Sequence, residues 1–120
     1  MQRHITALNN KASPERLQSV IALERLGKPA VDSLVYGLKD EDKWVRYAAS
    51  DALGNIGDQD SVDPLIGLLR DGGQDVRFVT ADTLGRLGNP KATGALFNLC
   101  VHNKGFIKIA AENAPAKIAH

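Results

Sequence analysis

Residues 45–57 read VRYAASDALGNIG, and residues 76–88, which lie 31 positions further on, read VRFVTADTLGRLG. A third copy begins another 31 positions along at Ile107, and a looser copy runs from Glu15 to Gly27. Apolar residues return every three or four positions in each copy, which is the spacing of an amphipathic helix. A second helical pattern lies between successive copies, for example from Val62 to Leu69. The chain is therefore built from units of 30 or 31 residues with two helices each.

Residues that favour helix ends stand at the same places in different copies. Gly57 and Gly88 follow the last apolar residue of their copies, where a helix commonly ends on a glycine in the left-handed conformation. Ser13 and Asp75 are candidate N-caps, and Pro14 occupies a first helical position. These residues predict where the helices of a unit begin and end.

Neither helix of a unit can cover its own apolar face, whereas stacked units bury these faces in one continuous core. No alternating pattern of useful length predicts a strand, so we expect one all-α domain over 1–120. Its units are expected at about 1–26, 30–56, 61–87 and 92–119. The four antiparallel helix pairs are expected at 1–9 with 14–26, 30–39 with 44–56, 61–70 with 75–87, and 92–102 with 106–119. Pro115 predicts a kink or an early end in the last helix, because proline in a helix interior costs about 3 kcal/mol.

The repeated motif V-R-x-x-A-x-x-A-L-G-x-I-G resembles the short HEAT-like repeats of the phycobilisome-lyase type. This resemblance implies a right-handed α–α superhelix of the armadillo-like kind, with an Asp at each turn and an Arg six residues later. Two units match this pattern, with Asp40 and Arg46 in one and Asp71 and Arg77 in the next. Asn10 with Arg16 and His102 with Lys108 are weaker equivalents at the two ends. We expect a structural ladder in which each Arg pairs with a turn Asp, and an anion-binding row is the alternative.

One helix position that faces away from the expected core is apolar in every copy: Leu17, Tyr47, Phe78 and Ile109. Asp51 and Asp82 lie on the same concave face, and Gly54 and Gly85 predict a groove beside the apolar side chains. Aromatic residues are favoured in protein contacts. We therefore expect this face to bind a helix or an extended peptide with basic residues. The alternative is that neighbouring units cover these side chains.

Composition narrows the class of protein. The 120 residues include 15 basic and 14 acidic side chains, and the single cysteine, Cys100, excludes an internal disulfide. No stretch approaches the roughly 18 apolar residues of a membrane span, and the first residues lack the apolar core of a secretory signal. We expect a cytoplasmic protein without a membrane partner.

Charge is distributed unevenly, with +3 over residues 1–39, −6 over 40–82 and +4 over 83–120. This pattern fits the steering of a basic partner to the centre or weak self-association. Solvated outer faces are the simpler interpretation. Asp51 and Asp82 would repel phosphate, which argues against a nucleic-acid partner.

Residue patterns typical of catalysis are absent from the sequence. His4, His102 and His120 are isolated, and none belongs to a His-Glu pair like those that hold di-iron in the HEAT-like deoxyhypusine hydroxylases. We therefore expect no metal, no cofactor and no enzymatic activity, and predict a scaffold that binds a protein or peptide. A bilin-lyase-like or lyase-accessory role is the alternative that the resemblance allows. Trp44, the only tryptophan, is either an exposed anchor or packed over the adjacent unit.

Overall fold

The computed structural model describes residues 13–102, and every regular element in this range is helical. The helices are α2 (Ser13–Leu26), α3 (Val31–Gly37), α4 (Lys43–Ile56), α5 (Val62–Leu68), α6 (Gln74–Leu87) and α7 (Thr93–His102). A short 3₁₀ turn precedes each of α3, α5 and α7, so these helices begin one residue later than expected. The all-helical solenoid is confirmed. The helices expected at 1–9 and 106–119, together with Ile109 and Pro115, lie outside the described residues.

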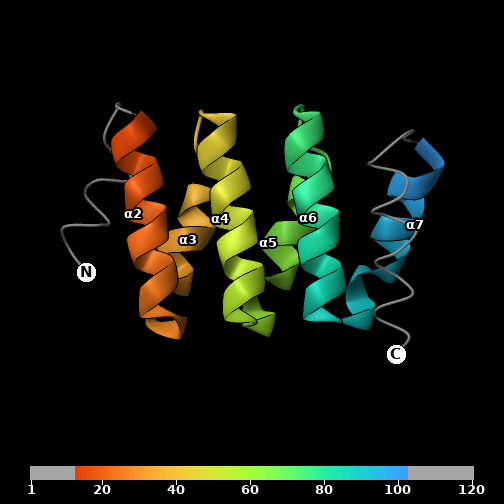
Figure 1. Ribbon diagram of the computed structural model, residues 1–120. Helices are drawn as coiled ribbons and strands as arrows, with labels where there is room; N and C mark the ends of the chain where they lie inside the picture. The colour runs from red at the N-terminus through yellow and green to blue at the C-terminus, as the bar shows by residue number, and fades with distance from the viewer. Residues whose placement is uncertain (1–12, 103–120) are drawn as a thin grey trace.

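The helices form two layers, with α2, α4 and α6 side by side in one of them (Figure 1). Helices α3 and α5 lie behind this first layer, and α7 follows at the C-terminal side of the array (Figure 1). Helix α4 packs between α2 and α6, α3 packs on α4, and α5 packs on α6. The repeats therefore stack in chain order.

The core repeats with the sequence. Leu23, Leu53 and Leu84 occupy equivalent positions of α2, α4 and α6, and all three are fully buried. Leu34, Leu65 and Leu96 do the same for α3, α5 and α7. Burying a leucine contributes about 1.5–3 kcal/mol, so the stacked layers have a regular source of stability.

Glycine ends two of the helices, as predicted. Gly57 has φ 80° and Gly88 has φ 69°, which is the left-handed region. Their N–H groups donate to the carbonyl oxygens of Leu53 and Leu84, at 3.0 and 3.1 Å. A residue with a side chain would be strained at either position.

The helix beginnings differ from the prediction at Asp75. Gly73 is the N-cap of α6, and Asp75 is the second helical residue. The carboxylate of Asp71 accepts a hydrogen bond from Gly73 N at 2.8 Å and holds the turn that starts the helix. In α4 the cap is Asp42, whose carboxylate accepts from Trp44 N at 2.7 Å.

Buried hydroxyl groups join α4 to α6. The hydroxyls of Ser50 and Thr80 lie 3.1 Å apart, and Thr83 Oγ1 donates to the carbonyl oxygen of Ser50 at 3.2 Å. All three side chains are fully buried. The equivalent positions between α2 and α4 are Val20, Ala49 and Ala52, which are also buried.

Candidate partner-binding face

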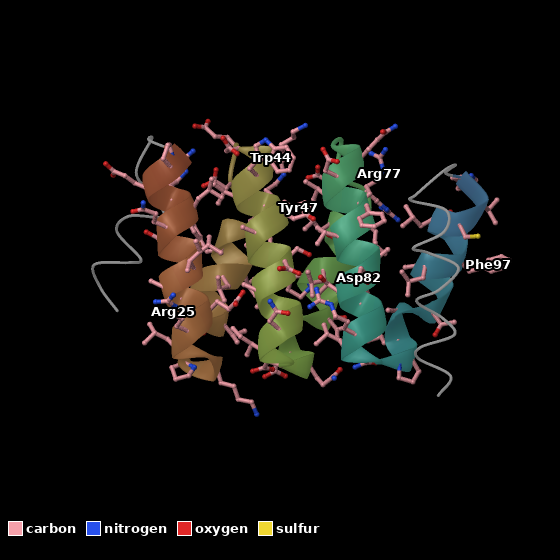
Figure 2. All side chains as sticks on the ribbon, viewed as in Figure 1. Arg25, Trp44, Tyr47, Arg77, Asp82 and Phe97 are labelled. Carbon is pink, nitrogen blue, oxygen red and sulfur yellow. The ribbon has the colours of Figure 1, made fainter. Side chains whose placement is uncertain are left out.

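Helices α2, α4 and α6 present one surface away from α3 and α5, and we call it the α2–α4–α6 face. Figure 2 shows Tyr47 and Asp82 on this surface. Leu17 and Tyr47 are half-buried and pack against the core, whereas Phe78 is 37% exposed. The structure thus places three of the four predicted apolar side chains on adjacent helices. Ile109 lies outside the described residues.

An aromatic group stands at the N-terminal end of α4. Trp44 is 48% exposed, and its ring meets that of Tyr47 edge-to-face, with centroids 5.7 Å apart and planes at 61°. Lys43 Nζ lies 5.0 Å from the centroid of the Trp44 ring and 3.5 Å from Asp75 Oδ2. Of the two expectations for Trp44, the structure agrees with the exposed anchor. Edge-to-face pairing holds the two rings in a defined arrangement.

Asp51 and Asp82 are bridged by a residue that the sequence analysis did not single out. Arg86 Nη2 lies 2.8 Å from Asp51 Oδ1, and Arg86 Nε lies 3.1 Å from Asp82 Oδ2. The two carboxylate side chains remain 45% and 40% exposed. Two carboxylates around one guanidinium leave a local charge of about −1. The spacing of Asp82 and Arg86 at i and i+4 was the available signal for this pair.

Hydrogen bonds continue from Arg86 towards α2. Arg86 Nη1 donates to Asn55 Oδ1 at 2.6 Å, and Asn55 Nδ2 donates to Glu24 Oε1 at 3.3 Å. The polar side chains of α2, α4 and α6 therefore form one connected row. The row links the three helices across the α2–α4–α6 face.

The side chain of Arg86 also explains why position 54 holds a glycine. A Cβ atom on this glycine would lie 2.9 Å from Cζ and Nη2 of Arg86 and 2.9 Å from Cγ2 of Thr83. Real Cβ atoms do not approach other atoms this closely, so the guanidinium rests directly on the backbone of α4. The predicted groove at Gly54 is wrong, because the side chain of Arg86 fills the space.

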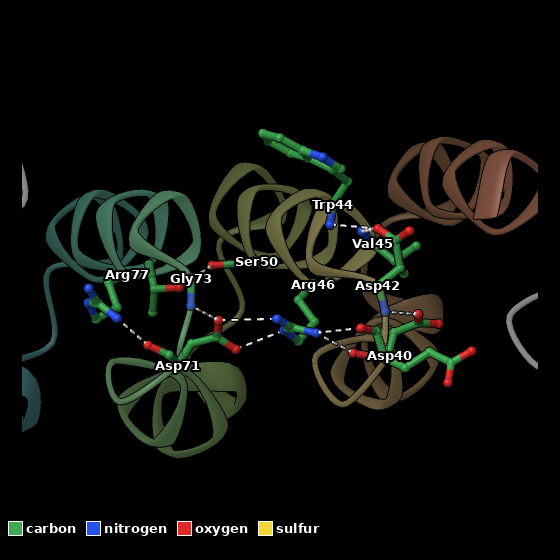
Figure 3. Close-up of polar contacts among 11 residues, drawn as sticks. Asp40, Asp42, Trp44, Val45, Arg46, Ser50, Asp71, Gly73 and Arg77 are labelled. Carbon is green, nitrogen blue, oxygen red and sulfur yellow. Dashed lines mark hydrogen bonds and ion pairs between the residues drawn. The ribbon is translucent and has the colours of Figure 1, made fainter.

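The Asp residues of the turns bind Arg residues of the first-layer helices, and these ion pairs form the predicted ladder (Figure 3). Arg16 Nε lies 2.9 Å from Asp40 Oδ2, and both side chains are buried. Arg46 makes two bonds to the carboxylate of Asp71, Nε to Oδ1 at 2.7 Å and Nη2 to Oδ2 at 3.2 Å. Its Nη1 donates to the carbonyl oxygens of Asp40 and Glu41 at 2.8 and 3.1 Å. Each of these arginines therefore reaches the turn carboxylate of the next repeat.

Arg77 differs from the two preceding arginines. Its Nη1 donates to the carbonyl oxygen of Asp71. Its Nε is buried, and no described residue accepts a hydrogen bond from it. The repeat places His102 where a carboxylate would be expected. Among residues 13–102, no carboxylate forms an ion pair with Arg77.

Two further observations concern residues 13–102. No group of three or more His, Cys, Asp or Glu side chains in this range is arranged to hold a metal ion. None of its helices is both long and apolar enough to cross a lipid bilayer.

Comparison with protein families gives one match, described as HEAT repeats. The family model matches residues 3–78 and, in an overlapping second match, residues 31–116. No curated protein sequence matches the chain.

Solved structures with the same arrangement of helices include two complexes. Human deoxyhypusine hydroxylase in complex with glycerol has a TM-score of 0.88 and 24% identity, and the match covers 99% of this chain and 43% of that one. The complex of CpcE and CpcF of phycocyanin lyase from Nostoc sp. PCC7120 has a TM-score of 0.74 and 20% identity, with 96% and 63% covered. The chain thus spans less than two thirds of either structure. Similarity at these identities shows a common fold.

Proposed function

Because this chain belongs to the HEAT-repeat family, we propose that it is a non-enzymatic module that binds a segment of a partner protein on the α2–α4–α6 face. The HEAT-like repeat predicted from the sequence is confirmed by the family match. The observation that supports this face is the aromatic group at the start of α4, in which Trp44 is exposed and Tyr47 is half-buried, with the exposed Phe78 on the next helix. We also propose that 1–120 is one repeat domain in four units and that it acts in the cytoplasm.

The aromatic side chains would supply most of the affinity. Tryptophan and tyrosine are enriched among the residues that dominate binding energy at protein interfaces. Trp44 and Tyr47 are already held edge-to-face, so little side-chain freedom is lost when a partner covers them. Phe78, 37% exposed on α6, extends the apolar contact to a second helix.

Asp51 and Asp82 would give the face a preference for a basic partner. Their carboxylates are shared with Arg86 but remain 45% and 40% exposed. A lysine or arginine of the partner would therefore meet a local charge of about −1. The preference would be weaker than two free carboxylates would give, because part of their charge is already neutralised.

The lyase-like alternative draws on the fold alone, since the phycocyanin lyase structure is 20% identical to this chain and a fold does not carry an activity with it. Incubation with a bilin tests it directly. A visible absorption band that stays with the protein, or that passes to an acceptor cysteine, would contradict the non-enzymatic assignment.

Pull-down from the native lysate tests the binding proposal. We compare the wild-type protein with the Tyr47→Ala, Phe78→Ala double variant and identify the proteins retained by mass spectrometry. We expect a partner that the double variant loses, and a loss of affinity of about 2 kcal/mol or more, roughly thirtyfold, when the interaction is measured with purified components.

Tyr36→Ala is the matched control. Tyr36 is 56% exposed but belongs to α3, in the other layer. Circular dichroism and thermal unfolding establish that all variants remain folded. Equal retention of every partner by the wild type and the double variant would contradict the proposal.

A further inference from the structure

A hollow of about 610 Å³ lies in the second layer between α5 and α7. It is lined by Ile66, Gly67, Leu69, Arg70, Ala95, Asn98, Leu99 and His102. This volume falls within the range typical of ligand sites and exceeds that of a single side chain. None of these residues belongs to the α2–α4–α6 face, so this site and the proposed function can succeed or fail separately.

One position of the repeat differs at the hollow. Gly67 of α5 is equivalent to Tyr36 of α3, whose side chain is 56% exposed. A Cβ atom on Gly67 would meet nothing within 4 Å. The α5 side of the hollow therefore has no side chain at the position where the preceding repeat has a tyrosine.

The rim of the hollow carries a basic residue. This residue is Arg70, and the equivalent position of the preceding repeat is held by Lys39. Arg70 and His102 are both exposed at the rim of the hollow, and no carboxylate is among its described lining residues. Arg70 also forms no ion pair with any residue in the described range. The rim therefore offers a cationic group that can bind an acidic one.

The floor of the hollow is apolar. Leu69 and Leu99 are buried at its base, and Ile66 and Ala95 are half-buried along its sides. An occupant therefore needs apolar groups for the floor and a negative charge for the rim. Arginine binds carboxylates through paired hydrogen bonds, which adds direction to the charge attraction.

We propose that this hollow binds an acidic peptide segment of a partner protein. One or two apolar side chains of the segment pack on Leu69 and Leu99, and a neighbouring Asp or Glu binds Arg70 beside His102. A protein segment fits better than a free small molecule, because Gly67 and Asn98 are also exposed. Small-molecule sites usually enclose most of their ligand, whereas this hollow leaves one side in water.

The test uses two blocked peptides as probes. One is acetyl-Phe-Leu-Asp-Glu-Leu-amide, and the other has Asn-Gln in place of Asp-Glu. Each is titrated into the ¹⁵N-labelled full chain while amide chemical shifts are recorded. We expect saturable shifts centred on Gly67, Arg70, Asn98 and His102 with the acidic peptide, and binding about tenfold weaker with the neutral one.

Paired variants separate the hollow from general effects. Gly67→Tyr places a large side chain in the lining of the hollow, whereas Gly94→Tyr adds the same side chain at an exposed glycine of α7 outside the lining. We expect at least about tenfold weaker binding for Gly67→Tyr and no change for Gly94→Tyr. Arg70→Gln should weaken binding about fivefold, and Lys39→Gln, at the equivalent position of the preceding repeat, should not.

Several results would overturn the proposal. These are the absence of shifts at millimolar peptide, equal binding of both peptides, shifts confined to the α2–α4–α6 face, or insensitivity to Gly67→Tyr. Decanoate is titrated as a small amphiphilic carboxylate. If decanoate binds in the hollow and the acidic peptide does not, the assignment to a protein segment is wrong.

Discussion

Arg46 and Arg77 occupy the same position in consecutive repeats, yet their surroundings differ. Arg46 makes two bonds to the carboxylate of Asp71 and two to backbone carbonyl oxygens. Arg77 keeps a carbonyl contact, but its buried Nε has no acceptor among the described residues. At the position equivalent to Asp71, the next repeat has His102, which carries no carboxylate. What one repeat residue contributes therefore depends on the unit that follows it.

The turn itself also changes between these repeats. Helix α5 ends at Leu68, and Asp71 then accepts a hydrogen bond from Gly73 N. Helix α7 continues through His102, the last described residue. A carboxylate at this position thus has two roles, because it pairs with the preceding arginine and it shapes the turn into the next helix.

The largest expected difference is between Arg46→Gln and Arg77→Gln. We expect the first to lower the free energy of unfolding by about 2–3 kcal/mol, because it leaves the largely buried carboxylate of Asp71 without its charged partner. Arg77→Gln should lower the free energy of unfolding by less than about 1 kcal/mol. Urea denaturation followed by circular dichroism measures both values. Equal losses would show that the two arginines contribute alike.

A smaller effect, in the stabilising direction, is expected from His102→Asp. This substitution introduces a carboxylate at the repeat position that would pair with Arg77. We expect the free energy of unfolding to rise by about 1 kcal/mol, since Arg77 Nε gains an acceptor. The same substitution in an Arg77→Gln background should give no gain, and this double-mutant cycle isolates the pair. A gain of the same size in both backgrounds would mean that the effect comes from the helix end.

The smallest effects are expected at exposed ion pairs outside the ladder. Lys43 with Asp75 and Lys91 with Asp63 have side chains that are between 47% and 67% exposed. Lys43→Gln and Lys91→Gln should each change the free energy of unfolding by at most about 0.5 kcal/mol. Urea denaturation of the two variants and the wild type measures these changes in the free energy of unfolding. A loss as large as that of Arg46→Gln would remove the distinction between buried and exposed pairs.

The fold followed from the sequence because its signals are local and repeated. The apolar spacing around Leu53 and Leu84 and the glycines at 57 and 88 each act within one or two helical turns. Stacking then requires only that every unit bury its apolar face against its neighbours. Asp75 was misread as a cap because the bond from Gly73 N to Asp71 is made by a side chain two residues back in the turn.

The surface was harder to predict because it depends on contacts between helices. Arg86 reaches Asp51 across 35 positions of sequence, and this contact also places its guanidinium over Gly54. The spacing of Asp82 and Arg86 indicated one pair, but nothing local indicated the second carboxylate. The sequence shows a glycine at position 67, where the preceding repeat has Tyr36. The hollow beside Gly67, however, depends on how α5 lies against α7.

The hydroxyl groups of Ser50, Thr80 and Thr83 have a mechanical consequence. Hydrogen bonds are directional, so these bonds lock the axial register of α4 against α6. The equivalent buried contacts between α2 and α4, through Val20, Ala49 and Ala52, are apolar, and the hydrogen bond from Asn55 to Glu24 that joins these helices is exposed. When the array is bent or stretched, the contact between α4 and α6 is therefore expected to resist sliding more than the contact between α2 and α4.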